Sequence, residues 1–169
     1  MSVDATLAPE DPLDWLAGVH AELRAVCTLL ERLIGGATVD AGERHAAAAF
    51  VGDVLPMHLR DEEEDLFPLL RRRCTEEDEI GRILGVLGAE HGQEGEHTAR
   101  VVAILARTTL TASCRRTLVA FTRQQREHVA IEDGVVLPIA RMRLGRRDLA
   151  TLRGRMVARR AQLEPNFAR

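Results

Sequence analysis

Residues 51–69, VGDVLPMHLRDEEEDLFPL, place apolar side chains at alternating three- and four-residue spacing around a histidine and a glutamate. The members of this stripe are Val51, Leu55, His58, Glu62, Leu66 and Leu69. Such spacing puts all of them on one face of a helix. The face is apolar at both ends and polar in the middle, which predicts a core helix with a polar site inside the protein.

Three other segments repeat this stripe, and each has a histidine near its middle: His20, His91 or His128. We therefore expect four long helices, over about 12–34, 41–66, 76–107 and 113–136, and a short fifth over about 146–163. Only short segments separate these expected helices, and helices joined by short connections tend to pack as antiparallel neighbours. The expected fold class is all-α, an up-down-up-down four-helix bundle with a short C-terminal fifth helix.

The ends of these helices have recognisable signals. Asp11 and Pro12 are typical of the start of a helix and Gly35 and Gly36 of its end, which delimits the first helix. Pro68 is expected to end or kink the second helix. We divide the chain into a flexible arm over 1–11, the bundle over 12–145, and a C-terminal helix and tail over 146–169.

Composition narrows the classes of protein that fit. The 169 residues are 46% hydrophobic but only 3% aromatic, with no tyrosine, which favours helices and excludes tyrosyl-radical chemistry. A net charge of -3 argues against nucleic acid as the partner, and no apolar run is long enough to span a membrane. Three cysteines without a CxxC pair are typical of reduced thiols, so we expect a cytoplasmic protein.

Two local repeats carry the chemistry. His58 and Glu62 are followed by Pro68, and a second set with the same spacing is His128, Glu132 and Pro138. One His-x-x-x-Glu pair is weak evidence, because glutamate is common in this chain. Each pair, however, is preceded in the sequence by the single histidine of the stripe before it, and the two separations in sequence are nearly equal. The chain therefore reads as two helix-pair halves related by a pseudo-twofold axis.

Burying these six side chains together requires a compensating charge. One unpaired glutamate in a helical core costs several kcal/mol, and two glutamates with four histidines would cost more. Two metal ions resolve this problem, because each can take two imidazoles and each carboxylate can bridge both ions. Imidazole and carboxylate without thiolate favour non-haem iron, with manganese or zinc as alternatives.

The order His, His-x-x-x-Glu, His, His-x-x-x-Glu resembles the hemerythrin-like (HHE cation-binding) domains over about residues 13–141. The resemblance implies a four-helix bundle with an oxygen- or hydroxide-bridged di-iron centre. It implies that His20 and His58 bind one iron ion and that His91 and His128 bind the other. Glu62 and Glu132 would then bridge the two ions.

One departure from the family bears on function. The oxygen-carrying hemerythrins have a fifth histidine where this chain has Gly95, so the resemblance implies a more open site and argues against simple oxygen carriage. Glu94 lies on the same stripe, and we expect it to be either an additional metal ligand or a hydrogen-bond partner of an imidazole. Gln125 lies one turn before His128. We expect it to be either a spacer or a hydrogen-bond donor to an oxygen species bound to the metal.

Other residues near the stripes have a simpler interpretation. Glu63, Glu64 and Asp65 are expected to be solvated, with Asp65 close enough to Glu62 to touch its surroundings. Five glycines recur at helical spacing, and we favour close helix packing, within the bundle or between subunits, over a path for a small molecule. They are Gly81, Gly85, Gly88, Gly92 and Gly95.

The sequence supports one main hypothesis and several alternatives. The main one is a non-haem di-iron protein that binds or turns over O2, peroxide or nitric oxide. The alternatives are non-catalytic iron storage, sensing of O2, nitric oxide or iron, iron-centre repair, and a structural zinc-bound bundle. A homo-oligomer is compatible with each, and the sequence does not decide whether the protein is an enzyme.

Overall fold

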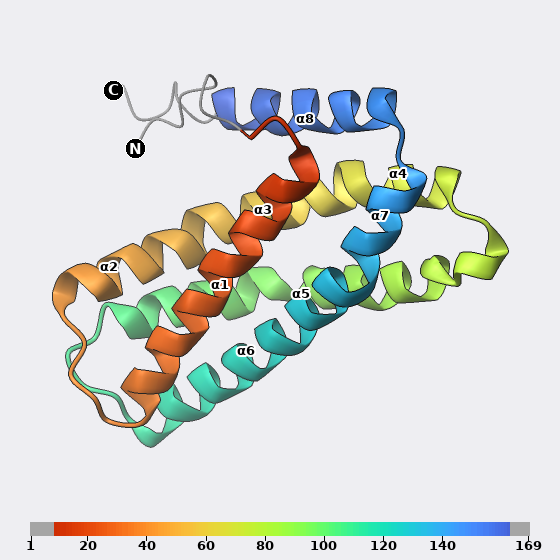
Figure 1. Ribbon diagram of the computed structural model, residues 1–169. Coiled ribbons are helices and arrows are strands. Elements are labelled where there is room, and N and C mark those ends of the chain that lie inside the picture. Colours follow the sequence, from red (N-terminus) through yellow and green to blue (C-terminus); the bar gives the residue numbers. More distant parts are fainter. Residues whose placement is uncertain (1–8, 163–169) are drawn as a thin grey trace.

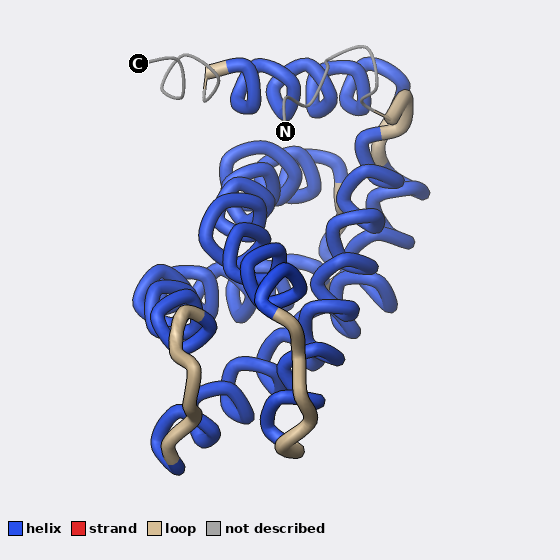
Figure 2. The backbone as a smooth tube through the Cα atoms, turned by 90° about the vertical axis from the view of Figure 1, so that its left-hand side faces the viewer, coloured by secondary structure: helices blue, strands red, loops and turns tan. Residues whose placement is uncertain are grey.

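The computed structural model describes residues 9–162, and within that range the chain is helical and contains no strand (Figures 1 and 2). Five helical runs follow one another along the chain. The first four are α1 (Pro12–Ile34), a long run from α2 to α4, α5 (Ile80–Leu105), and a run from α6 to α7. The fifth is α8 (Arg146–Ala161). The expectations for residues 1–8 and for Leu163 and Pro165 lie outside the described residues.

The second run consists of α2 (Ala41–Ala49), η1 (Phe50–Val54), α3 (Leu55–Asp61), η2 (Glu62–Leu66) and α4 (Phe67–Arg73). The fourth consists of α6 (Ala112–Ile131), η4 (Glu132–Val136) and α7 (Leu137–Arg143). The segments η1, η2 and η4 are π-helical turns. Connections 35–40 and 106–111 lie at one end of the bundle and 74–79 at the other (Figure 1). The up-down-up-down order is our interpretation of these connections.

The predicted starts of the first two helices are confirmed, and that of the third is wrong. Asp11 accepts a hydrogen bond from Leu13 N at 2.8 Å, and Asp40 forms a capping box with its partner three residues on. Thr75 and Asp78 also form such a box, but they close only the 3₁₀ turn η3 (Glu76–Asp78). Glu79 then adopts a left-handed conformation with φ 48°, so the long helix begins at Ile80.

The prediction that the second helix ends near Leu66 is also wrong, because it continues through Pro68 to Arg73. The N–H of Phe67 bonds to the carbonyl of Glu62, five residues back, and Pro68 follows as the second residue of α4. Proline has no N–H to donate, so the wider π turn lets the helix pass a residue that would otherwise break it. Pro138 follows η4 in the same way.

The π turn η4 also moves the buried face by one residue. In the fourth helix, the stripe that contains His128 and Glu132 continues at the same spacing to Val135 and Ile139, which it predicts as core positions, but Val136 and Ala140 are the buried ones. The π turn accommodates one residue more than an α turn, so the positions beyond it slip round the helix. The α-helical period therefore fails only beyond η4.

The core consists of two apolar clusters, one on each side of a polar layer. One cluster includes Leu23, Leu30 and Leu118, and the other includes Leu16 and Leu84. The predicted stripes, apolar at their ends and polar in the middle, are confirmed in this respect. Cys27 and Cys114 are buried free thiols in the first cluster, as expected for small core residues.

The fifth helix, α8, lies across α1, α3 and η2 and is held by charges as well as by apolar contacts (Figure 1). Asp61 is fully buried and contacts Arg159 and Arg160, while Asp65 Oδ1 and Oδ2 bond to Arg155 and Arg159 at 2.9 and 2.6 Å. Asp65 is therefore buried and not solvated. Burial raises the pKa of Asp61 even with two arginines in contact.

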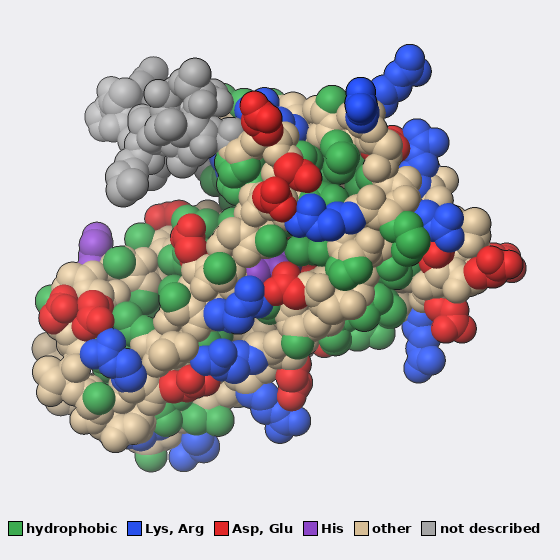
Figure 3. All heavy atoms as spheres, viewed as in Figure 1, with side chains coloured by type: hydrophobic (Ala, Val, Ile, Leu, Met, Phe, Trp, Pro, Cys, Tyr) green, Lys and Arg blue, Asp and Glu red, His purple; other side chains and the backbone are tan. Residues whose placement is uncertain are grey.

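No helix in the described part of the chain is long and apolar enough to cross a membrane. On the face shown in Figure 3, acidic and basic side chains alternate, with apolar side chains between them. That face therefore has no extended basic patch of the kind that binds nucleic acid.

We predict that Arg159→Met lowers the free energy of unfolding by roughly 2–4 kcal/mol, because two buried carboxylates each lose a partner. Arg123→Met is the matched control, since Arg123 pairs with Glu127 in solvent, where an ion pair contributes little to stability. Urea unfolding of the metal-free protein measures both. Equal, small losses would show that the α8 charges do not stabilise its docking.

Candidate metal centre

The polar layer gathers the six predicted side chains from six elements. His20 projects from α1, His58 from α3, His91 from α5 and His128 from α6. The two glutamates are the first residues of the π turns η2 and η4. No side chain of the six is more than 6% exposed. A turn that widens the helix at each glutamate is a feature common at functional sites.

The four imidazoles form two pairs that face each other through Nε2. His20 Nε2 lies 3.1 Å from His58 Nε2, and His91 Nε2 lies 2.9 Å from His128 Nε2. Each pair joins one histidine from a lone-histidine helix to one from a His-x-x-x-Glu helix, as the pseudo-twofold interpretation predicts. Two nitrogen lone pairs directed at one point are suited to sharing a cation.

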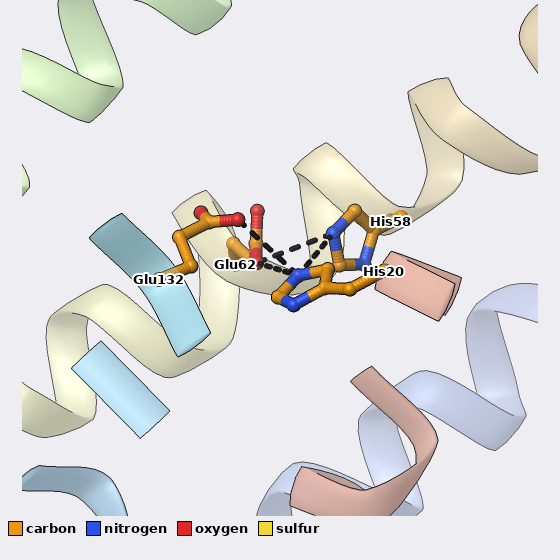
Figure 4. A group of neighbouring side chains, drawn as sticks. All are labelled: His20, His58, Glu62 and Glu132. Carbon is orange, nitrogen blue, oxygen red and sulfur yellow. Dashed lines mark hydrogen bonds and ion pairs between the residues drawn. The ribbon is translucent and has the colours of Figure 1, made fainter. Parts of the chain in front are cut away.

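Glu62 reaches both histidine pairs. Its Oε1 lies 3.3 Å from His58 Nε2 and 3.6 Å from His20 Nε2, and its Oε2 lies 3.8 Å from His91 Nε2. Figure 4 shows Glu62, His20 and His58 directed toward one another, together with Glu132. One carboxylate oxygen thus faces each pair.

Glu132, in the helical run from α6 to α7, also reaches both histidine pairs. Its Oε2 lies 3.2 Å from His20 Nε2, and its Oε1 lies 3.0 Å from His128 Nε2. The residues therefore form two four-ligand groups that share both glutamates, one with each histidine pair. Each group has the number and type of donors that hold a metal ion.

Carboxylates outside the six orient two of the imidazoles through Nδ1. Asp133 Oδ1 lies 2.6 Å from His20 Nδ1, and Glu63 Oε1 lies 3.0 Å from His91 Nδ1. Such partners fix the tautomer of a ligating histidine and raise its basicity. Sequence reasoning missed both residues and expected Glu63 to be solvated. Extending the His-x-x-x-Glu repeat by one position, to the acidic residue that follows each glutamate, would have found them.

The other two imidazoles are not equivalent. Glu90 Oε2 lies 2.9 Å from His128 Nδ1, whereas His58 Nδ1 is buried without a hydrogen-bond partner in residues 9–162. The pseudo-twofold axis relates Glu90 to Val19, because each precedes the lone histidine of its helix. An apolar side chain at that position leaves His58 without the carboxylate that His128 has.

Three carboxylate oxygens in the layer are likewise buried without a hydrogen bond in the described chain: Glu62 Oε2 and both oxygens of Glu132. A buried polar atom without a partner costs about 1–3 kcal/mol, and more when it is charged. Both Glu132 oxygens face imidazole Nε2 atoms, at 3.2 and 3.0 Å, so the cation they need is either a protonated imidazole or a bound metal ion. The donor set and these oxygens fit a pair of metal cations.

The pKa values of side chains in the polar layer are shifted because charged groups are buried close together there. Burial and then the charge of Glu132 raise the pKa of Glu62 to about 8. Burial also lowers the pKa of His58 to about 3, assisted by the nearby His20. The pKa of Glu132 is lowered because His128 and His20 outweigh its burial. Two adjacent carboxylates thus cannot both ionise freely without a cation.

Glu94 and Gln125 lie beside the layer and contact each other. Glu94 is buried, and its two oxygens accept bonds from Gln125 Nε2 at 2.6 Å and Gln124 Nε2 at 3.4 Å. Neither four-ligand group includes Glu94, and no hydrogen bond in the described chain joins it to an imidazole. The pair therefore forms a separate polar wall next to the histidines.

The five glycines of α5 do not serve close packing within this chain. At four of them an added Cβ would meet nothing within 4 Å, and at Gly88 it would lie 3.6 Å from Glu63 Oε1. Packing within the bundle, half of the interpretation favoured from the sequence, is therefore wrong. Packing between subunits stays a prediction.

Residues 11–140 match the model of the hemerythrin HHE cation binding domain. No curated protein and no solved structure gives a significant match. The matched range contains all six side chains of the polar layer and ends before α8.

Three successive residues allow a matched test of the layer, Glu62→Gln, Glu63→Gln and Glu64→Gln. We predict that the first variant loses one or both metal ions, because that carboxylate faces both histidine pairs. The second keeps two ions but binds them roughly 10–100-fold more weakly, the usual effect of losing a ligand's outer partner. The third matches wild type, since Glu64 bonds to Arg60 in solvent. Metal analysis after dialysis measures the number of bound ions, and competition titration measures the affinity. Equal metal content and equal affinity in all three variants would contradict the assignment.

Proposed function

Because this chain belongs to the hemerythrin HHE cation-binding family, we propose that it holds two iron ions and uses them to bind or turn over a small oxidant. The observation that supports this most directly is the pair of glutamates, each with one oxygen toward each histidine pair. The proposed ligands are His20, His58, Glu62, His91, His128 and Glu132.

The donor set is compatible with iron. Neutral imidazoles and carboxylates suit iron, manganese and zinc, while a thiolate would favour zinc. None of the three cysteines belongs to either four-ligand group. Zinc and manganese remain the competing occupants, and metal analysis separates them.

The roles of the protein and of the metals are distinct. Bound iron supplies Lewis acidity and a redox centre for O2, peroxide or nitric oxide. The protein keeps the layer dry between two apolar clusters, and Asp133, Glu63 and Glu90 hold three imidazoles with Nε2 directed inward. We place the protein in the cytoplasm, where its free thiols stay reduced.

A second candidate function, sensing, rests on the position of α8. Asp61 and Asp65 flank Glu62 in sequence and bind Arg155, Arg159 and Arg160 of α8. A change at Glu62 would therefore reach the docking surface of α8 within one helical turn. In this case the ligand shifts the packing of α8 without being turned over.

Anaerobic loading with ferrous iron tests the proposal. We expect two iron ions per chain, an absorption band near the ultraviolet edge after exposure to air, and loss of both on His58→Ala. Consumption of peroxide by the iron form indicates an enzyme, and a change in α8 protection from hydrogen exchange without turnover indicates a sensor. Uptake of zinc alone, with no iron retained, would refute the di-iron proposal.

Metal affinity should rise with pH. Burial opposes protonation, but Glu132 and Glu62 raise the pKa of His20 to about 10, and Glu132 and Glu90 raise that of His128 to about 9. Both imidazoles thus carry a proton at neutral pH in the metal-free protein and must release it from Nε2 to bind a metal. We expect about tenfold tighter binding per pH unit for each proton displaced, between pH 6 and 8.

Calorimetry in buffers of different ionisation enthalpy counts the released protons. The expected number at pH 7 is at least one per chain. An affinity that does not change with pH would show that both imidazoles are already neutral before the metal binds.

A further inference from the structure

The two halves of the site have equal ligands but unequal surroundings. Counting from the lone histidines, Gly95 corresponds to Arg24, and Glu94 corresponds to Leu23. Counting from the His-x-x-x-Glu pairs, Gln125 corresponds to Leu55. One histidine pair therefore has a glycine and two polar side chains at positions where the other has a large charged residue and two leucines.

A cavity of about 270 Å³ opens on the half with the glycine, between α3 and α5. The residues that line it include His91, Glu94, Gly95, Thr98 and Leu59. Neither histidine of the other pair lines it, and His20 and His58 are 0% and 1% exposed. Of the four histidines, His91 alone lines this opening, so the opening borders the second pair through that one imidazole.

Position 95 determines whether the cavity is open. An added Cβ at Gly95 would meet nothing within 4 Å, so a longer side chain there would extend into the cavity and not into packed protein. The corresponding Arg24 pairs with Asp133, which in turn contacts His20. That arginine covers the outside of the first pair, whereas glycine leaves the second pair accessible.

The lining favours an uncharged ligand. The guanidinium of Arg60 is paired with Glu64 at 2.9 Å, which leaves Glu63 and Glu94 as unbalanced acids around the cavity. An anion entering it would meet negative charge at low dielectric. A diatomic molecule or hydrogen peroxide would meet no such penalty and is far smaller than the cavity.

We infer that a small uncharged molecule enters through this cavity, past Gly95, and reaches the metal position between His91 and His128 and not the one between His20 and His58. This rests on the proposed function, because it requires metal at the six-residue site. Gly95 is then the residue that sets access, and Glu94, held by Gln125, presents a polar side chain to the incoming molecule.

Filling the cavity tests the inference. Gly95→Leu projects into it from α5, and Leu59→Trp fills it from the opposite wall. Gly85→Leu is the matched control, because Gly85 lies on the same helix, also has nothing within 4 Å of an added Cβ, and does not line the cavity. Both glycine variants gain similar helix propensity, so thermal melting should shift alike in the two.

The readouts are iron per chain and the rate at which nitric oxide changes the spectrum of the anaerobic ferrous protein. All variants should bind two iron ions. Gly95→Leu and Leu59→Trp should slow the association of nitric oxide by about tenfold or more, and Gly85→Leu should match wild type.

Wild-type rates in either cavity variant that retains two iron ions would overturn the inference while leaving the proposed function intact. Equal slowing in Gly85→Leu would also overturn it, since the effect would then not come from the cavity. Failure of the wild-type chain to bind iron is a different result, which refutes the proposed function itself.

Discussion

Two carboxylates buried among four imidazoles are the constraint on which the rest of this structure depends. An apolar cluster lies on either side of the layer and both carboxylates are buried, so Glu62 and Glu132 have little choice of partner. Hydrophobic burial folds the four helices, but it works against the charges at their centre. In the proposed function, cations at the two four-ligand groups would convert that conflict into a stable site. The stability of the fold and its capacity for metal are thus two consequences of one arrangement.

The π turns show how the helices accommodate this layer. Each bridging candidate, Glu62 or Glu132, is the first residue of such a turn, and a proline follows just beyond its end. The turn lets the helix continue past the proline. At η4 it also moves the buried face by one residue, so that Val136 and Ala140 lie in the apolar cluster beyond the site. Helix continuity and ligand placement therefore depend on the same local distortion.

The pseudo-twofold symmetry of the site is incomplete, and the differences are as informative as the repeats. Asp133 and Glu63 hold equivalent imidazoles, but Glu90 has only Val19 as its counterpart, and Gly95 has Arg24. One metal position is enclosed by apolar side chains and an arginine, while the other borders a polar cavity. Two ions in such surroundings need not share the same affinity, potential or access, although their ligands are of the same kind.

The sequence alone determined the all-helical class, the helix faces and the six side chains of the layer. Periodicity and spacing act locally, and a helix places residues four apart on one face whatever surrounds it. Only the tertiary structure decided what depends on contacts between distant segments or on wider turns. These features are the continuation of two helices past Pro68 and Pro138, the burial of Asp65 against α8, the outer partners Glu63, Glu90 and Asp133, and the cavity beside Gly95. A one-dimensional pattern shows which residues share a face, but which helix that face meets depends on packing between segments far apart in the chain.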